Sequence, residues 1–250
     1  MRTVKLGFPL IHLSSVDSTN KYASGILHKE NATEGTVILA DVQTQGKGQG
    51  DNTWLSDKGL NLLCSIILKP DFLPANKQFY LSMCIATGIT DCLTDLGVRP
   101  QVKWPNDILI KGKKVAGILI ENTILSQNLR TSIVGIGLNV NQVSFLPCIP
   151  NPASLAGETG KLHDIGQLLE RLLFFLEKRL IYLYAEDFMP IKSQYLNCLW
   201  LLNIHAAFTD RKGAFEGRIV DVAETGELVI LTSSGETRMY GFKEVEFAGH

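Results

Sequence analysis

A glycine-rich loop at residues 43–54, QTQGKGQGDNTW, places three alternate glycines around Lys47 and ends at Trp54. Backbone N–H groups in such a loop, together with a lysine, can hold a phosphate group. The loop fits neither common phosphate-loop pattern, because Gly48 follows Lys47 and Asp51 stands where a dinucleotide fingerprint has its third glycine. By itself the stretch is equally compatible with a surface turn.

Three further short stretches combine hydroxyl, amide, carboxylate or lysine side chains at close spacing. They are VDSTN at residues 16–20, KWPND at 103–107 and KKVAG at 113–117. Each one also has an ordinary structural interpretation. Asp17 or Ser18 could cap a helix over about residues 19–28, residues 106–107 could form a turn, and Lys114 could be a solvated charge.

The segments between these stretches predict a mixed α+β domain. Apolar runs at 35–43 and 59–70, on either side of the glycine loop, predict buried strands. Further strands are predicted within 107–121, around a tight turn at residues 111–112, and over 131–141. Helices are predicted over about 75–97, from Asp164 onward with a cap completed at Gln167, and through about residue 197.

After about residue 200 the pattern of apolar and turn residues changes. Short apolar runs separated by RKG, ETG and SSGE fill residues 203–250 and predict a small all-β barrel. We therefore expect two domains, a larger one over residues 1–200 and a small β domain over 201–250.

Composition narrows the function classes. The net charge of −1 argues against a protein that binds nucleic acid through bulk positive charge. No apolar run approaches the roughly 20 residues needed to span a bilayer, and the N-terminus lacks the features of a signal peptide. We expect a cytoplasmic protein without a membrane partner.

The cysteines and histidines predict neither disulfides nor a metal centre. There are five cysteines, an odd number, with no Cys-x-x-Cys pair, which indicates free thiols in a reducing compartment. The histidines are scattered without metal-ligand spacing, so no metal site built by protein side chains alone is expected.

Taken together and in this order, VDSTN, the glycine loop, KWPND, KKVAGILIE and GIGLNVN resemble the biotin protein ligase family, the biotin–acetyl-CoA-carboxylase ligases. The resemblance runs from about residue 12 to 141 and includes the C-terminal β segment. It implies a mixed sheet with flanking helices, related to class II aminoacyl-tRNA synthetases and named the biotin/lipoate ligase fold. A small SH3-like β barrel would follow this sheet.

The resemblance also implies a reaction in two steps. Biotin and Mg-ATP would give biotinyl-5′-AMP and pyrophosphate, and a lysine of a biotin carboxyl carrier protein would then attack this intermediate. ATP, biotin and Mg²⁺ are therefore the expected ligands, with Mg²⁺ held largely by phosphates and water. The biotin carboxylate and the α-phosphate repel by about 4 kcal/mol at about 4 Å, so a cation is needed between them.

Residues of this chain match the family's site positions. Lys114 would bridge carboxylate and phosphate, and Lys47 would face phosphate when the loop closes, which makes these two the expected catalytic residues. Trp54 would stack on adenine or pack in the core. The expected biotin-binding residues are Ser18, Thr19, Asn20, Gln43, Lys47, Gly48, Gln49, Lys114 and Gly117. The expected ATP-binding residues are Gly46, Lys47, Trp54, Asn106, Lys114 and Asn139.

The loop departs from the arginine-rich form found in many relatives. Lys47 is its one cation, and Gln49, Asp51 and Asn52 stand where arginines are common. This departure concerns how strongly the loop would retain the adenylate, because fewer cations are available to bind its phosphate.

Other readings of the sequence remain. Lipoate protein ligases share the fold and the adenylation chemistry, and a non-catalytic module could bind nucleic acid or a regulatory ligand through its β barrel. Only 17 residues precede Ser18, too few for the N-terminal DNA-binding domain of some relatives, so a ligase without a DNA partner is expected. The sequence is compatible with a homodimer and does not decide it.

Overall fold

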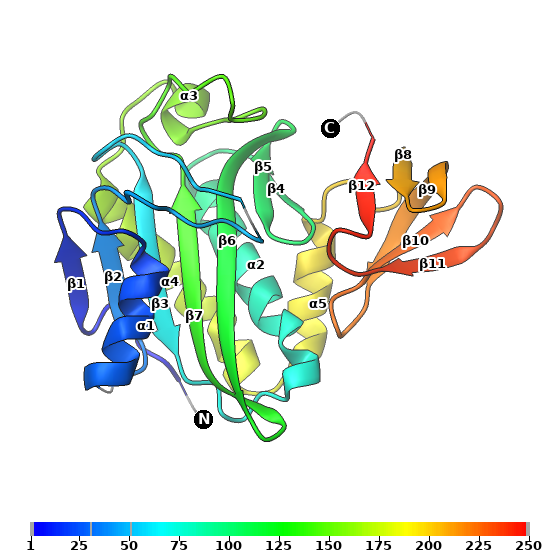
Figure 1. Cartoon of the computed structure of the whole chain (residues 1–250). Coiled ribbons are helices and arrows are strands. Elements are labelled where there is room, and N and C mark those ends of the chain that lie inside the picture. The colour runs from blue at the N-terminus through cyan, green and yellow to red at the C-terminus, as the bar shows by residue number, and fades with distance from the viewer. Residues whose placement is uncertain (1–2, 31, 51, 249–250) are drawn as a thin grey trace.

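The computed structural model describes residues 3–30, 32–50 and 52–248, and these form two β-sheets with flanking helices (Figure 1). The larger sheet has the strand order β1-β2-β3-β7-β6-β5-β4. Only β1 and β2 pair in parallel, and every other neighbouring pair is antiparallel. The strands are β1 Leu10–Leu13, β2 Val37–Ala40, β3 Leu62–Leu68, β4 Pro100–Lys103, β5 Asp107–Ile110, β6 Lys113–Leu125 and β7 Asn128–Leu138. The predicted mixed sheet is confirmed.

Helices cover the two faces of this sheet unequally. Figure 1 shows α2, α4 and α5 behind the sheet, whereas α1 covers part of the front. The helices are α1 Thr19–Glu30, α2 Phe79–Asp95, α3 Leu155–Thr159, α4 Ile165–Tyr184 and α5 Phe188–Asn197, with a 3₁₀ turn at Ala75–Lys77. The predicted helix over 75–97 therefore begins later, because one 3₁₀ turn after Pro74 precedes α2.

The alternation of side chains along β7 explains why part of the front face stays open. Val134, Ile136 and Leu138 point into the main core behind the sheet. The residues between them point to the front, where Ile133 packs against α1 but the next two positions are Gly135 and Gly137. Without side chains at these two positions, the front of the sheet beyond α1 is free to form a cavity floor.

The start and the buried face of α4 both follow from local patterns in the sequence. The side chain of Asp164 accepts a hydrogen bond from the N–H of Gln167 at 2.8 Å, as predicted. The predicted apolar stripe of this helix is buried except for the half-buried Ile165. Its buried members are Leu168, Leu169, Leu172, Leu176 and Leu180.

The C-terminal segment forms the separate antiparallel sheet expected of an SH3-like domain, with the order β11-β10-β9-β8-β12. Its strands are β8 His205–Asp210, β9 Gly213–Val222, β10 Leu228–Thr232, β11 Thr237–Tyr240 and β12 Val245–Phe247. The indole N–H of Trp104 donates a 2.8 Å hydrogen bond to the carbonyl of Gly226, which ties the small domain to the larger one. The division near residue 200 stays a prediction, and residues 249–250 of the predicted domain lie outside the described part.

Two sequence expectations can be compared directly with the described residues. All five cysteines are free thiols, as expected. Within the described residues, none of the helices has the length and apolar character needed to cross a membrane.

Candidate functional site

A cavity of about 960 Å³ lies over the open part of the sheet front. It is bounded by the start of α1, the glycine loop, the 103–107 turn, the 148–152 segment and the small domain. The lining residues are far apart in the sequence and meet here through the strand order of the sheet and the packing of the small domain. The predicted site residues that line it are Ser18, Thr19, Asn20, Gln43, Lys47, Gly48, Gln49, Trp54, Asn106, Lys114, Gly117 and Asn139.

Trp54 lies on the cavity floor. Gly117 of β6 and Gly137 of β7 are cross-strand partners, and the indole packs against both. A Cβ atom at Gly137 would lie 2.5 Å from Cε2 of Trp54, and one at Gly117 would lie 3.0 Å from its Cζ3. We expected Gly117 to leave room for a ligand, whereas in this structure Trp54 occupies that space. The Nε1 of Trp54 is buried, and no described residue accepts its hydrogen bond.

One end of the cavity is a hydrogen-bonded polar cluster. Both the backbone N–H and the hydroxyl of Thr19 donate to Oε1 of Gln43, at 2.8 and 3.0 Å. The hydroxyl of Ser65, on β3, lies 2.7 Å from the hydroxyl of Thr19 and 2.6 Å from Oδ1 of Asn20. These contacts hold Thr19 and Gln43 at the start of α1 in defined orientations.

Both the nitrogen and the oxygen of the Asn20 side-chain amide make hydrogen bonds within the protein. Its Nδ2 donates to Oε2 of Glu121 at 2.7 Å and to the carbonyl of Leu119 at 3.3 Å, while Oδ1 faces Ser65. With these partners it positions the cluster, and its predicted biotin contact stays a prediction. Sequence reasoning missed Ser65 and Glu121, although a serine within the apolar strand LLCSIIL was an available signal for Ser65.

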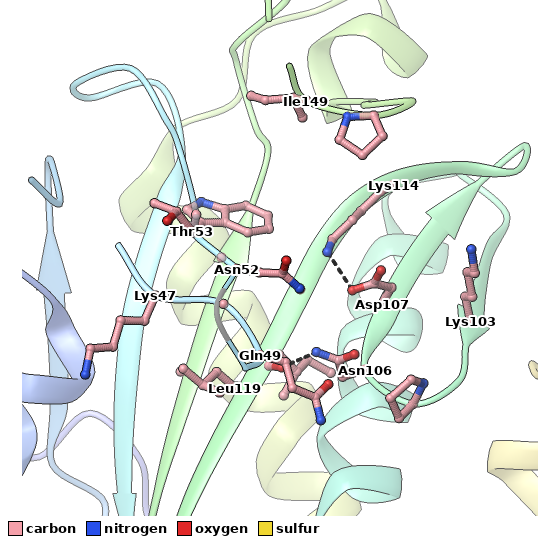
Figure 2. A pocket seen from close by; sticks show the side chains of 18 of the residues that line it. Lys47, Gln49, Asn52, Thr53, Lys103, Asn106, Asp107, Lys114, Leu119 and Ile149 are labelled. Atoms are coloured by element: carbon pink, nitrogen blue, oxygen red, sulfur yellow. Dashed lines mark hydrogen bonds and ion pairs between the residues drawn. The ribbon is translucent and has the colours of Figure 1, made fainter. Parts of the chain in front are cut away.

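The opposite end of the cavity carries an ion pair. Nζ of Lys114 lies 2.7 Å from Oδ1 of Asp107, and the ammonium stands 5.7 Å from the centroid of the Trp54 ring (Figure 2). Lys103 lies nearby, 5.4 Å and 5.1 Å from the ring centroids of Trp200 and Phe247. Burial lowers the pKa of the Lys103 ammonium below its usual value.

The glycine loop folds back on itself as a narrow hairpin. The N–H of Gly48 donates to the carbonyl of Asn52 at 2.7 Å, and that of Trp54 donates to the carbonyl of Gly46 at 2.9 Å. A Cβ at Gly46 would lie 2.4 Å from the Trp54 carbonyl oxygen, so this glycine permits the close backbone approach. Gly46 itself is not among the described residues that line the cavity, and its predicted ATP contact stays a prediction.

The side chains of the loop point in different directions, and Figure 2 shows that of Asn52 directed toward the Lys114–Asp107 pair. Figure 2 shows the Lys47 ammonium on the opposite side of the cavity from Lys114 and Asp107. Gln49 has a buried Oε1 for which no described residue is a donor. An unsatisfied buried polar atom costs about 1 to 3 kcal/mol, so Gln49 and Trp54 both present polar groups that a ligand could satisfy. The prediction for Asp51 falls outside the described residues.

Two asparagines carry carbonyl oxygens into the site. Nδ2 of Asn106 donates to the carbonyl of Ile118 at 2.8 Å, and Nδ2 of Asn139 donates to that of Ala153 at 2.9 Å. Among the described residues nothing donates to either Oδ1. Asn106, Asn139 and Asp107 all line the cavity, and their oxygens are of the type that Mg²⁺ held mainly by phosphate and water accepts. No group of three His, Cys, Asp or Glu side chains in the described part of the chain could hold a metal ion by itself.

Some lining residues were not predicted. Lys103 and Asp107 belong to the quoted KWPND stretch, so the signal was present but only Asn106 was assigned from it. Cys148 and the small-domain residues carried no recognisable signal, because their place at the site depends on how the domains pack. These small-domain residues are Phe242, Lys243, Val245, Glu246 and Phe247.

Comparisons with known proteins were consistent with one another. Residues 13–139 match the model of the biotin/lipoate A/B protein ligase family. The chain is 32% identical over 244 residues to the bifunctional ligase/repressor BirA of Bacillus spizizenii, covering 96% of this chain and 74% of that protein. It is 28% identical over 248 residues to the biotin–[acetyl-CoA-carboxylase] ligase of Paracoccus denitrificans, covering 95% of this chain and 100% of the relative.

Solved structures agree at the level of fold. The biotin protein ligase from Aquifex aeolicus in complex with biotin and ATP superposes with a TM-score of 0.79 at 29% identity. This superposition covers 95% of the present chain and 97% of the Aquifex chain. The similarity therefore extends over both sheets.

Proposed function

The chain belongs to the biotin/lipoate A/B protein ligase family and is a biotin protein ligase, and we propose that it joins biotin to a lysine of a biotin carboxyl carrier protein through biotinyl-5′-AMP. One observation carries the proposal: a single cavity joins the Thr19–Gln43 cluster to Lys114 across a floor of glycine and indole. Biotin has the same order of groups, a ureido ring, an apolar body and a carboxylate.

The polar end suits the ureido group. A cyclic urea presents two N–H donors and one carbonyl acceptor at short range, and Ser18, Thr19 and Gln43 offer hydroxyl and amide groups that line this cavity. Because Ser65 and Glu121 hold the cluster, these groups are oriented before the ligand arrives. The bicyclic ring would then lie against the Gly117–Gly137 floor, which requires Trp54 to move aside or to cover the ligand.

Lys114 would act in the first chemical step. A biotin carboxylate oxygen attacks the α-phosphorus of ATP, the bond from that phosphorus to the bridging oxygen breaks, and pyrophosphate leaves. Lys114 can hold the attacking carboxylate beside the phosphate, which offsets the repulsion between them. Asn106, Asn139 and Asp107 are the residues whose oxygens would hold Mg²⁺, and that ion supplies charge neutralisation of the phosphates.

The second step transfers the acyl group. A neutral lysine amine of the carrier attacks the acyl carbon, AMP departs with the electrons of the C–O bond, and the amine loses a proton. The mixed anhydride hydrolyses when water reaches it, so the glycine loop would cover it until the carrier arrives.

Pyrophosphate exchange tests the proposal. The enzyme should incorporate labelled pyrophosphate into ATP only when biotin is present, and mass spectrometry should then detect biotin on one lysine of an added carrier domain. Exchange supported by lipoate and not by biotin would assign the chain to the lipoate branch. Absence of exchange with both acids would contradict an adenylating enzyme.

A further inference from the structure

A carboxylate outside the cavity ends the hydrogen-bonded polar cluster. Glu121 is an exposed residue of β6 that does not line the cavity. Its Oε2 accepts a 2.7 Å hydrogen bond from Nδ2 of Asn20, and the carbonyl of Leu119 accepts a second one from the same nitrogen at 3.3 Å. A carboxylate and a carbonyl oxygen can only accept hydrogen bonds. These two acceptors therefore require the NH₂ group of the Asn20 amide on their side.

This orientation turns the oxygen of the Asn20 amide toward Ser65. Oδ1 lies 2.6 Å from the Ser65 hydroxyl, and a Cβ atom at Gly135 would lie 2.4 Å from it, so the amide is packed against the backbone of β7. Asn20 is 3% exposed and Ser65 is fully buried. A buried oxygen requires a donor, and the amide oxygen has no hydrogen of its own. The hydroxyl hydrogen of Ser65 therefore serves Asn20.

The cluster is then one hydrogen short. Its oxygens make three contacts, which join Asn20 with Ser65, Ser65 with Thr19 at 2.7 Å, and Thr19 with Gln43 at 3.0 Å. The two hydroxyl groups supply only two hydrogens for these contacts. Because the Ser65 hydrogen is used, that of Thr19 serves either Gln43 or Ser65, and the other contact has none. A ligand N–H that donates to Oε1 of Gln43 would release the Thr19 hydrogen for Ser65.

The reverse orientation of the Asn20 amide would remove this need. Asn20 would donate to Ser65, Ser65 would donate to Thr19, and the Thr19 hydroxyl would remain on Gln43. Every contact would then have its own hydrogen, and the cluster would gain nothing from a ligand N–H. Glu121 disfavours this arrangement, because it would place Oδ1 of Asn20 against a carboxylate oxygen at the present 2.7 Å contact.

We propose that Glu121 is a positioning residue that determines specificity: by fixing the direction of the hydrogen bonds in this cluster, it reserves the acceptor oxygens of Thr19 and Gln43 for ligands with a ring N–H. This inference rests on the proposed function, in which the cavity takes the ureido ring of biotin. It adds the discrimination between an N–H group and an oxygen at the same place in that ring. A site that leaves a buried polar group unpaired rejects the ligand that lacks the partner.

Equilibrium binding to the full-length protein tests this role without turnover. Calorimetry compares biotin with its two cyclic carbamate analogues, in which oxygen replaces one ring N–H or the other. Glu121→Gln is the informative change, because a glutamine can turn either an oxygen or an NH₂ group toward Asn20 and no longer dictates its orientation. Biotin should bind roughly fivefold more weakly, as expected for one neutral hydrogen bond. The carbamate that lacks the N–H facing Gln43 should keep its affinity, so the preference for biotin over it falls by the same factor.

Two further variants serve as controls. Glu170→Gln changes an exposed glutamate of α4 outside the cavity and should leave all affinities unchanged. Asn20→Asp combined with Glu121→Gln places the acceptor-only group at position 20 and the amide at position 121, so that Ser65 must again donate toward position 20. This double variant should recover most of the preference for biotin. Thermal unfolding shows that each variant is folded at the temperature of the titration.

The ratio of affinities separates a role in hydrogen-bond direction from one in packing. An unchanged preference for biotin in Glu121→Gln would overturn the proposal. Equal weakening of biotin and both carbamates would make Glu121 a packing residue and would overturn it as well, as would a double variant with no more preference than Glu121→Gln. In each of these cases a wild type that binds biotin leaves the proposed function intact. A wild type that does not bind biotin would overturn both.

Discussion

Lys114 and Asp107 form a 2.7 Å ion pair at one end of the cavity, and their side chains are 37% and 25% exposed. They lie on neighbouring strands, where the register of β5 with β6 shifts between Ile108 and Leu109. The pair keeps the lysine ammonium aimed along the cavity edge rather than into bulk solvent. Because both groups retain contact with water, the pair contributes about 0 to 1 kcal/mol to stability, and a carboxylate ligand can compete for the lysine.

Lys114→Ala should therefore affect chemistry far more than folding. We expect biotin-dependent pyrophosphate exchange to fall by roughly 10² to 10³, the usual cost of losing one preorganised electrostatic contact. Thermal unfolding should change little, because only a partly exposed ion pair is lost. An exchange rate within threefold of wild type would show that Lys114 is an ordinary surface charge.

Two buried serines on neighbouring strands should respond in opposite ways. Ser65→Ala removes a hydroxyl that contacts both Thr19 and Asn20, so it should destabilise the fold by about 1 to 3 kcal/mol and raise the KM for biotin roughly tenfold. Ser132 is equally buried, but its Oγ has no partner among the described residues. Ser132→Ala should leave stability and the KM for biotin unchanged or improved. Denaturant unfolding and exchange kinetics measure both, and similar effects of the two substitutions would refute a specific role for Ser65.

Gln49→Arg should slow release of biotinyl-AMP. The substitution places a cation at the part of the loop where many relatives carry arginine, and one charge-assisted hydrogen bond contributes about 1.5 to 3 kcal/mol. Release measured by stopped flow or filter binding should slow roughly tenfold or more, and the effect should shrink at high salt. Adenylate formation should stay nearly constant, because Lys114 governs it. Unaltered release in this variant, with fast release in Lys47→Ala, would mean that position 49 faces away from the phosphate.

Thiol reactivity should separate two cysteines that line the same cavity. Burial raises the pKa of the Cys64 thiol to about 12, so almost no thiolate exists near neutral pH, whereas Cys148 is exposed. Iodoacetamide at pH 8 should label Cys148 first, and Cys148→Ser should remove the fast phase seen by mass spectrometry. Fast labelling of Cys64 would indicate that the cavity floor opens in solution.

Local patterns in the sequence determined much of this protein. Asp164 predicted the start of α4, the strands on both sides of the glycine loop followed from their apolar runs, and KWPND with KKVAG predicted residues that line the cavity. These signals are readable because caps, strand alternation and short motifs depend on residues close together in the chain.

Tertiary structure alone decided which distant groups meet at the site. Ser65 reaches Thr19 and Asn20 because β3 lies beside α1, and Trp54 rests on Gly137 because the loop returns over β7. Lys243 reaches Gly50 only through docking of the small domain on the larger one. No short-range pattern encodes these contacts, because each one depends on strand register and domain packing summed over the whole fold.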